Sequence, residues 1–576
     1  SLRDYLTKSE IAGRDEEIIF DPYLKEILKG RKEQSEISDI IETIQEKQYE
    51  IITKPERDSF VVQGCAGSGK TMIMLHRLSF LMYNNENLHP SDILVITPSD
   101  SFNAFIDELS RVLELEKIKT YTIDEYFIRL LKNEGVDITD KIDPALAAPK
   151  EYTEYIYSDR FYDYVENKLS KIYDGLAGMF LSDECRPIVA AVAENCRLQI
   201  QSFDFLRNAS VRVRRAVLGE IKERAEGGLY YTKPFRQLMN DVTYTEEFLR
   251  RLLIKGEYDN HGGFYRDLLT FYQGASTICK NAEQVIFTAQ QDLNRLKETV
   301  AKEISDLQRY KIIKSGIEVE TYPERIRKRQ ELLVEIEKTE KHVSLISDRF
   351  SPFYELFEVL EGNSYFVQIG KCRKHVELAR LFYREIVRNV KNKFGIGKGL
   401  LKSDAYVLCL LLALIDKKLQ PRFGLVFIDE GQDISHGEYK LLQLINENAA
   451  FNVYGDLEQN ITPQRGIKKW SEAVNASVYT LDQNYRNTNQ IVEFASADLG
   501  ITMRPIGFDG PPVAKIHPRG VTAFFRDKPG LKAVIVSPAD IQKYSRKSYN
   551  ILSETGKISK TKINLMTVFE SKGLEF

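Results

Sequence analysis

The chain alternates between two patterns of apolar and polar residues. Between about residues 59 and 135, short apolar runs at 60–63 and 93–97 are each followed by a helical period, at 71–82 and after Ser99. Strands that alternate with amphipathic helices are typical of a parallel sheet covered by helices. We therefore predict an α/β fold built on parallel sheets. The same pattern returns after about residue 405, with apolar runs at 425–428, 452–454, 478–481, 533–536 and 563–566.

Between about residues 140 and 405, long helical periods replace the strand pattern. Apolar residues there follow the three-four spacing of a coiled-coil seam. Ser315, Gly316 and Pro323 separate two such seams, which predicts an antiparallel helical hairpin over residues 281–347. Arms of about 30 residues would extend roughly 45 Å, although a buried helical bundle would show the same spacing. The seam residues are Ile286, Ala289, Leu293, Leu296 and Val300, followed by Ile326, Leu333, Ile336, Val343 and Ile346.

Composition narrows the class of protein. With 576 residues and 43% hydrophobic content, the chain is too long for one core, so we expect about three or four domains. Its six cysteines are widely spread without a C-x-x-C pair, which argues against zinc and a disulfide scaffold and favours a cytoplasmic location. The sequence has no apolar run of about 18 residues, so we expect no membrane partner.

The charge of the chain gives no overall signal for nucleic acid. A net charge of −3 means that any such binding would depend on a local patch. Basic residues gather between Lys371 and Lys393, where they could contact DNA or an acidic protein channel. A solvated helix face produces the same pattern, so this cluster leaves both interpretations open.

A glycine-rich segment follows the first predicted strand and matches the phosphate-binding pattern G-x-x-x-x-G-K-[ST]. In this pattern backbone N–H groups surround the phosphates, the Lys70 ammonium reaches the β- and γ-phosphates, and the Thr71 hydroxyl binds Mg²⁺. A glycine-rich turn of structural use is the alternative. We predict that ATP and Mg²⁺ bind here, at Gly64, Ala66, Gly67, Ser68, Gly69, Lys70 and Thr71.

Two acidic residues follow the apolar run at 425–428. A carboxylate that holds Mg²⁺ beside one that activates water is the arrangement that phosphoryl transfer requires. We assign Asp429 to the metal and Glu430 to the general base. An acidic turn at the end of a strand is the alternative.

These segments resemble, in order, the motifs of the superfamily 1 ATPase motors, the UvrD/Rep-like helicases. The resemblance implies two RecA-like parallel-sheet motor lobes, with the large all-helical insert in the first lobe, and an ATP-hydrolysing enzyme. It covers both motor lobes and says little about the insert. The matching segments are 46–52, 64–71, 93–98, 429–433, 454–459, 483–486 and 567–576.

The resemblance also implies roles for individual residues. Gln48 would read adenine, and Gln459 would sense the γ-phosphate. Tyr485 would stack on the base, Arg486 would reach the γ-phosphate, and Glu575 would contact the ribose. The predicted catalytic residues are therefore Glu430, Lys70, Gln459 and Arg486.

Several positions depart from the pattern of the strand-walking helicases. The residue after the phosphate-binding threonine is Met72 instead of arginine, and segments 97–100 and 460–464 lack the expected aromatic residues. Phe569 replaces a histidine. Aromatic platforms each contribute about 1–3 kcal/mol to the binding of single strands, so their loss predicts a weak grip on DNA.

The departures, together with segments 21–26, 44–52, 61–71 and 75–77, resemble the HelD family of bacterial motors that bind RNA polymerase. That resemblance implies a monomeric recycling factor whose insert displaces nucleic acid from the polymerase. A conventional 3′–5′ DNA helicase and a non-motor nucleotide-regulated binding module are the alternatives.

The expected domains follow from this reading. A helical segment at 1–45, the root of a missing N-terminal arm, precedes the first part of lobe 1 at 46–140 and the insert at 141–405. The second part of lobe 1 covers 406–480. Lobe 2 covers 481–576 and is expected to be incomplete at its C-terminal end, without a last arginine motif, so we expect ATP to bind and to be turned over slowly.

Overall fold

The computed structural model contains two compact units. The first, here the sheet unit, comprises the chain up to Tyr162, Phe394–Cys409, and the chain from Leu419 onward; the second, the helical unit, comprises Asp163–Lys393 and Leu410–Lys418. No helix in the described part of the chain is long and apolar enough to cross a bilayer. The structure describes residues 46–571 except 66, 99–117, 144, 145, 147, 219–232, 256, 257, 259, 260, 314–320, 398, 417, 418, 463, 485, 486, 501, 502, 506–508, 527, 529 and 556.

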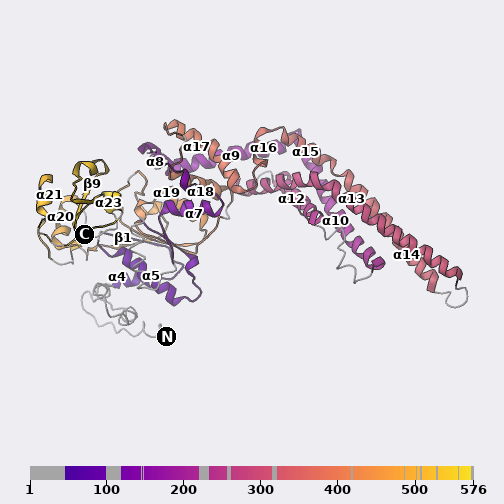
Figure 1. The fold of residues 1–576 in the computed structure, drawn as a ribbon, viewed down its shortest axis with the longest axis horizontal. Helices are drawn as coiled ribbons and strands as arrows, with labels where there is room; N and C mark the ends of the chain where they lie inside the picture. Colours follow the sequence, from indigo (N-terminus) through magenta and orange to yellow (C-terminus); the bar gives the residue numbers. More distant parts are fainter. Residues whose placement is uncertain are drawn as a thin grey trace. The chain divides into compact units, whose positions relative to one another are not determined.

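A six-stranded parallel sheet with the order β3-β2-β4-β5-β1-β6 is the centre of the sheet unit (Figure 1). Strand β1 lies between two strands that come about 400 residues later, with Phe60 opposite Asn452 on one side and Ser477 on the other. This parallel sheet confirms the predicted α/β class. Its strands are β1 (Phe60–Gly64), β2 (Ile93–Ile96), β3 (Thr120–Tyr121), β4 (Leu425–Ile428), β5 (Ala450–Gly455) and β6 (Ser477–Leu481).

Helices of the sheet unit bury apolar faces against these strands. Helix α5 packs against α4 and β5, and its residues Met74 and Leu78 belong to the same core cluster as Phe60 and Val62. Strands β2, β4 and β5 are buried along their whole length, as expected for a sheet covered on both faces. The helices are α4 (Glu46–Ile52), α5 (Lys70–Asn84), α7 (Ile123–Asn133), α8 (Lys150–Ile156), α19 (His436–Ile445) and the start of α18 (Ser403–Ile415).

A second, smaller parallel sheet follows, with the order β10-β11-β9. The predicted strands at 533–536 and 563–566 are present, whereas β10 (Tyr549–Ile551) was not predicted from the sequence. A further pair joins β7 (Gln483–Asn484) to β8 (Arg504–Pro505). The other elements here are β9 (Ala533–Val536), β11 (Ile563–Thr567), α20 (Asn489–Leu499), α21 (Val521–Phe524), α22 (Ile541–Tyr544), α23 (Leu552–Thr555) and α24 (Val568–Ser571).

The helical unit is held by an aromatic core. The rings of Phe180 and Phe248 have centroids 5.7 Å apart, and those of Phe248 and Phe271 are 4.9 Å apart. Such contacts join elements that are far apart in the chain, because large rings bury much apolar area. The helices are α9 (Asp159–Leu181), α10 (Cys185–Leu218), α12 (Lys233–Lys255), α13 (His261–Ile313), α14 (Thr321–Asp348), α15 (Ser351–Glu361), α16 (Ser364–Gly370) and α17 (His375–Lys393).

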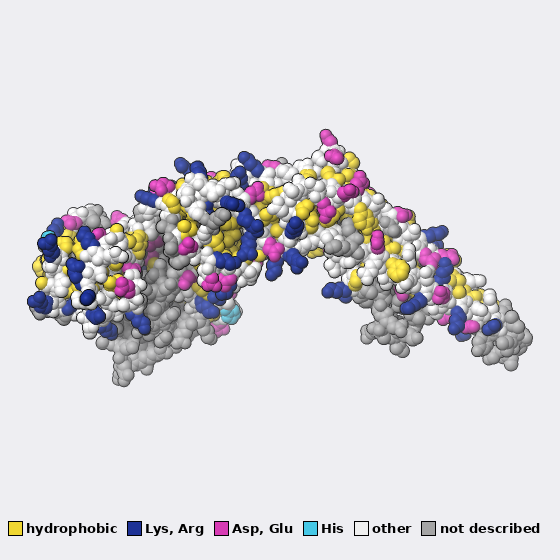
Figure 2. Space-filling view, turned by 45° about the horizontal axis from the view of Figure 1, so that its top comes forward, with side chains coloured by type: hydrophobic (Ala, Val, Ile, Leu, Met, Phe, Trp, Pro, Cys, Tyr) yellow, Lys and Arg dark blue, Asp and Glu magenta, His cyan; other side chains and the backbone are white. Residues whose placement is uncertain are grey.

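Helices α13 and α14 lie side by side and form the predicted hairpin (Figure 1). Lys297 is paired with Glu340 at 3.0 Å and Arg329 with Glu303 at 2.6 Å, a register that only antiparallel helices allow. The first helix begins at His261, twenty residues before the predicted start, because its early turns pack in the aromatic core. In the view of Figure 2, acidic and basic side chains are interspersed over the surface of the hairpin.

Most of the predicted seam is buried between the hairpin helices. Three of its ten residues are only half-buried, so fewer seam residues are shielded from solvent than the spacing predicted. The half-buried residues are Ile286, Ile326 and Leu333, and the buried ones are Ala289, Leu293, Leu296, Val300, Ile336, Val343 and Ile346.

Candidate nucleotide site

The phosphate-binding loop joins the end of β1 to the start of α5. Gly67 and Gly69 have φ angles of 74° and 78°, a left-handed conformation that glycine adopts without strain. A side chain on Gly64 would collide with the Ser68 hydroxyl and the stem of Lys70. Glycine is therefore required at these positions for a loop that closes tightly enough to present its N–H groups to phosphate. Ala66, also predicted to bind phosphate, lies outside the described residues.

The Lys70 side chain folds back over this loop. Its Nζ donates hydrogen bonds to the carbonyl oxygens of Gly64, at 2.8 Å, and Cys65, at 3.2 Å. The residue is buried. A buried ammonium held by carbonyl groups keeps its charge available at the mouth of the loop, where phosphate oxygens can replace the carbonyls as partners.

Thr71 and Asp429 meet although 358 residues separate them. The Thr71 Oγ1 donates a hydrogen bond of 2.7 Å to Oδ2 of Asp429, which directly follows β4. Burial and the neighbouring Glu430 raise the pKa of Asp429 to about 6. One carboxylate and one hydroxyl fit Mg²⁺, a hard cation that takes its other ligands from water and phosphate.

Glu430 has an unusual backbone conformation. Its φ is 52°, in the left-handed region, and its N–H donates to Oδ1 of Asp429 at 2.9 Å. Its Oε2 accepts a 2.6 Å hydrogen bond from Nε2 of Gln432. Non-glycine residues rarely adopt this conformation, and those that do occur often at functional sites. The backbone thus turns two adjacent carboxylates in different directions, one toward Thr71 and one toward Gln432.

A chain of amide hydrogen bonds continues from Gln432. Its Oε1 accepts from the N–H of Asp456 at 2.9 Å, and the Asp456 carboxylate accepts from Nε2 of Gln459 at 2.6 Å and of Gln63 at 2.7 Å. Trp470 is buried and donates its indole N–H to Gln63 at 2.8 Å. The network joins the ends of β1, β4 and β5. Sequence reasoning missed Gln63, Asp456 and Trp470, although polar residues at the ends of apolar strands are the signal that could have indicated the first two.

Gln48 lies on α4 next to the same loop. The side chain is buried, and its Nε2 is 3.5 Å from the carbonyl oxygen of Ser68. The structure thus brings together Gln48, the loop from Gly64 to Thr71, Asp429 and Glu430. Gln459 is linked to Glu430 through Asp456 and Gln432. Tyr485, Arg486 and Glu575 lie outside the described residues.

Three of the positions that depart from strand-walking helicases serve packing or local hydrogen bonds in the sheet unit, whereas Phe569 is exposed. Met72 packs against the apolar core of the sheet unit. Thr97 is buried, and its hydroxyl bonds to the carbonyl of Tyr121 at 3.3 Å. Asn460 caps its own turn, accepting from the N–H of Thr462 at 2.9 Å and donating to the Ile467 carbonyl at 3.2 Å.

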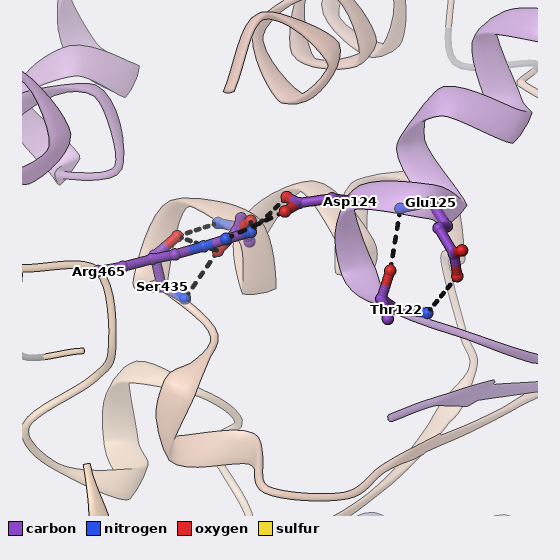
Figure 3. A network of polar contacts seen from close by, with 6 residues as sticks. Thr122, Asp124, Glu125, Ser435 and Arg465 are labelled. Atoms are coloured by element: carbon purple, nitrogen blue, oxygen red, sulfur yellow. Dashed lines mark hydrogen bonds and ion pairs between the residues drawn. The ribbon is translucent and has the colours of Figure 1, made fainter. Parts of the chain in front are cut away.

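Arg465 anchors that turn through partly buried ion pairs (Figure 3). Its guanidinium bonds to Asp124 on α7, with a shortest distance of 2.7 Å, and to Glu438 on α19. Burial opposes ionisation of Asp124, but Arg465 outweighs it and holds the pKa of that carboxyl below its usual value. Thr122 and Glu125 cap the first turn of α7 reciprocally. The segment after Gln459 is therefore tied to the helix that follows Glu430.

A phosphate loop at the end of one parallel strand and adjacent carboxylates at the end of another define a P-loop nucleotide-binding protein of the RecA-like type. The family model described as the UvrD/REP helicase N-terminal domain matches residues 44–467. The chain belongs to this family, and it is a superfamily 1 helicase-like motor with RecA-like lobes and a helical insert. The fold class and the family predicted from the motifs are confirmed.

A short part of the chain is also similar in sequence to a known helicase. The chain is 28% identical over 90 residues to the ATP-dependent DNA helicase Rep of Buchnera aphidicola subsp. Schizaphis graminum (strain Sg). The match covers 14% of this chain and 14% of that protein. The similarity is thus confined to a short part of both proteins.

Proposed function

We propose that this protein hydrolyses ATP and uses the reaction to drive movement between motor lobes. The hydrogen bond between Thr71 and Asp429 carries the proposal, because it joins the phosphate loop to the acidic strand end as a shared Mg²⁺ site requires. Mg²⁺ would neutralise charge on the phosphates when bound. Lys70 would hold the β- and γ-phosphates, and Glu430 would orient and deprotonate the attacking water.

The chain of amide hydrogen bonds links Glu430 to Gln459, so a change at the catalytic site can reach the next strand end. A change at Glu430 alters the partner of Gln432, whose Oε1 holds the backbone of Asp456, which in turn holds Gln459. In the proposed cycle, Gln459 and Arg486 contact the γ-phosphate and report its loss. Hydrolysis then shifts the ends of the strands that precede Glu430 and Gln459.

We further propose that the motor acts on RNA polymerase and displaces nucleic acid from it, as the resemblance to the HelD family implies. The turn after Gln459 supports this, because residues 460–467 contain no aromatic side chain and are held by Asn460 and Arg465 within the lobe. A base could not stack there as on the platforms of single-strand-binding proteins. The exposed residues Arg384 and Arg388 on α17 could contact an acidic surface.

A conventional DNA helicase is the second candidate. The family match and the similarity to the Buchnera Rep protein favour it. A non-motor nucleotide-regulated module is weaker, since a protein that only binds nucleotide has no use for Glu430 in its strained conformation.

A pull-down from bacterial lysate, combined with an ATPase assay, separates these candidates. We expect wild type to capture RNA polymerase and Glu430→Gln to capture more, because a motor that binds but does not hydrolyse ATP stays in the complex. Glu447→Gln, an exposed glutamate just after α19 and outside the motif segments, is the matched control and should behave as wild type. Strong stimulation of the ATPase by bare single-stranded DNA, without capture of polymerase, would establish the helicase instead.

A further inference from the structure

Arg77 is fully buried in the middle of α5, two turns after Lys70. Its Nη1 and Nη2 atoms donate to the carbonyl oxygens of Ile51, Ile52, Lys54 and Pro55, at 3.3, 3.1, 2.7 and 2.9 Å. Its Nε donates to Oδ1 of Asn452 on β5 at 2.5 Å. A single guanidinium therefore joins α5, the end of α4 and the strand that leads into Gly455.

Among the described residues, the hydrogen-bond partners of this cation are backbone carbonyls and one amide, and none of them is a carboxylate. Ile51 and Ile52 are the last residues of α4, where helix carbonyls lack intrahelical partners and carry the negative end of the helix dipole. The carbonyl groups at the end of α4 thus share the buried charge with Asp58 and Glu56, whose carboxylates favour the ionised guanidinium without bonding to it. The Phe60 ring lies 5.0 Å from the guanidinium carbon and closes the site on another side.

Helix α4 depends on this contact for its position. Its apolar residues Ile51 and Ile52 enter the core, while Arg77 binds their carbonyl groups. Gln48 is one turn earlier on the same helix, with its amide 3.5 Å from the Ser68 carbonyl. Any shift of α4 would move that amide away from the loop.

We propose that Arg77 is a positioning residue for purine selection: it holds α4 so that the Gln48 amide meets adenine and rejects guanine. This inference rests on the proposed function, in which the site binds ATP. A fixed amide can accept from the adenine N6 amine while it donates to N7, whereas guanine presents acceptors at both O6 and N7. Discrimination therefore requires an amide in a fixed position. The Arg77 guanidinium fixes α4, and with it the amide of Gln48.

The test compares the affinities of the full-length chain for ATP, GTP and inorganic tripolyphosphate, each with Mg²⁺. The variants are Arg77→Lys, Gln48→Ala and their combination, with Arg57→Lys as the matched exposed arginine. We expect Gln48→Ala and Arg77→Lys each to lower the preference for ATP over GTP by roughly tenfold. The double variant should lower it no further. Tripolyphosphate, which has no base, should bind all four proteins within about twofold of wild type, and Arg57→Lys should match wild type throughout.

Equal weakening of ATP, GTP and tripolyphosphate in Arg77→Lys would overturn the inference and leave the arginine with a purely structural role. Wild type that binds ATP and GTP equally would overturn it too, without affecting the proposed ATPase. Wild type that binds no nucleotide would overturn the proposed function as well. If Arg77→Lys does not fold, Asn452→Ser removes the acceptor of Nε together with the donor to the Asp58 carbonyl, and leaves the contacts of Arg77 to α4 in place. A drop in the ATP preference with unchanged tripolyphosphate affinity is required of it.

Discussion

The two units treat buried polar groups differently. In the sheet unit, Lys70, Arg77 and Gln432 are buried, and each has several hydrogen-bond partners contributed by other elements. In the helical unit, the hydroxyls of buried Thr245 and Thr339 donate to the carbonyl four residues earlier in their own helix. Single polar contacts such as Tyr265 to the Leu169 carbonyl, at 2.5 Å, do join its helices, but they are scattered among rings and aliphatic side chains. The sheet unit instead gathers its polar interior at one site.

Under the proposed function, this difference separates the unit that would bind and hydrolyse ATP from the unit that would contact a partner. Polar side chains in a low-dielectric interior must be satisfied, so they specify which strand ends lie together. An aromatic core tolerates variation, provided that volume and patterning are kept. Substitutions of one kind should therefore have unequal effects in the two units.

The largest contrast is expected for lysines. Lys70→Ala removes the cation from the phosphate loop, and we expect kcat/KM for ATP to fall by about 10²–10³ or more, the range for loss of a preorganised electrostatic group. Lys297→Ala on α13, which breaks a pair with Glu340, should leave ATP turnover unchanged. Steady-state ATPase assays with thermal melts as a folding control measure both. Equal losses in the two variants would refute the division of labour.

Arginines should show the next contrast, in stability. Arg465→Met leaves the buried Glu438 and the partly buried Asp124 without their cation, so we expect a cost toward the lower end of the about 3–5 kcal/mol of a fully buried pair. Arg251→Met breaks the exposed pair with Asp267 in the helical unit and should cost less than about 1 kcal/mol. Urea unfolding followed by the fluorescence of Trp470, the single tryptophan, reports on the sheet unit, and far-UV circular dichroism weights the helices.

An Arg465→Met variant that unfolds at the wild-type urea concentration by tryptophan fluorescence would show that the buried pair is not needed. A loss seen equally by both probes would mean that the two units unfold as one.

The same contrast explains what could be predicted from the sequence. The residues of the phosphate loop and Asp429 follow from local patterns, because a strand, a turn and a helix suffice to recognise them. The roles of Gln63, Arg77 and Arg465 depend on which strands and helices become neighbours. Sheet order β5-β1-β6 places Gln63 beside a strand almost 400 residues later, and no local period encodes that.

In the helical unit too, the sequence predicted what depends on local spacing and missed what depends on tertiary contacts. The three-four spacing identified two helices and their antiparallel pairing. It did not reveal that α13 begins at His261, because the first turns of that helix bury Phe264 and Phe271 among rings from other helices. Their environment is determined by tertiary contacts and not by the seam.

Glutamines should respond with opposite signs. Gln199 on α10 is fully buried, and neither amide atom has a partner in the described residues. Replacing an unsatisfied buried amide with leucine should stabilise the helical unit by about 1–2 kcal/mol. Gln432→Leu should destabilise the sheet unit, because Glu430 and the Asp456 N–H lose their partner. Chemical denaturation with the two probes gives both values, and a destabilised Gln199→Leu would indicate that the amide is satisfied by water.

The smallest effect concerns aspartates and pH. Burial raises the pKa of Asp241 on α12 from 3.8 to about 6, and its Oδ2 is buried without a hydrogen-bond partner in the described residues. A folded-state pKa above the unfolded value means that the folded chain binds the extra proton between these limits, so stability falls as pH rises from about 4 to 6 and then levels. Because the side chain is only half-buried, solvent screening should keep the loss below about 1 kcal/mol.

The melting temperature of Asp241→Asn should therefore equal that of wild type near pH 4 and exceed it at pH 7. Asp183→Asn, a change at an exposed position, should show the wild-type melting temperature at both pH values. A constant difference between Asp241→Asn and wild type across this range would show that Asp241 is ionised at both ends, and that the helical unit satisfies its buried carboxylate as fully as the sheet unit does.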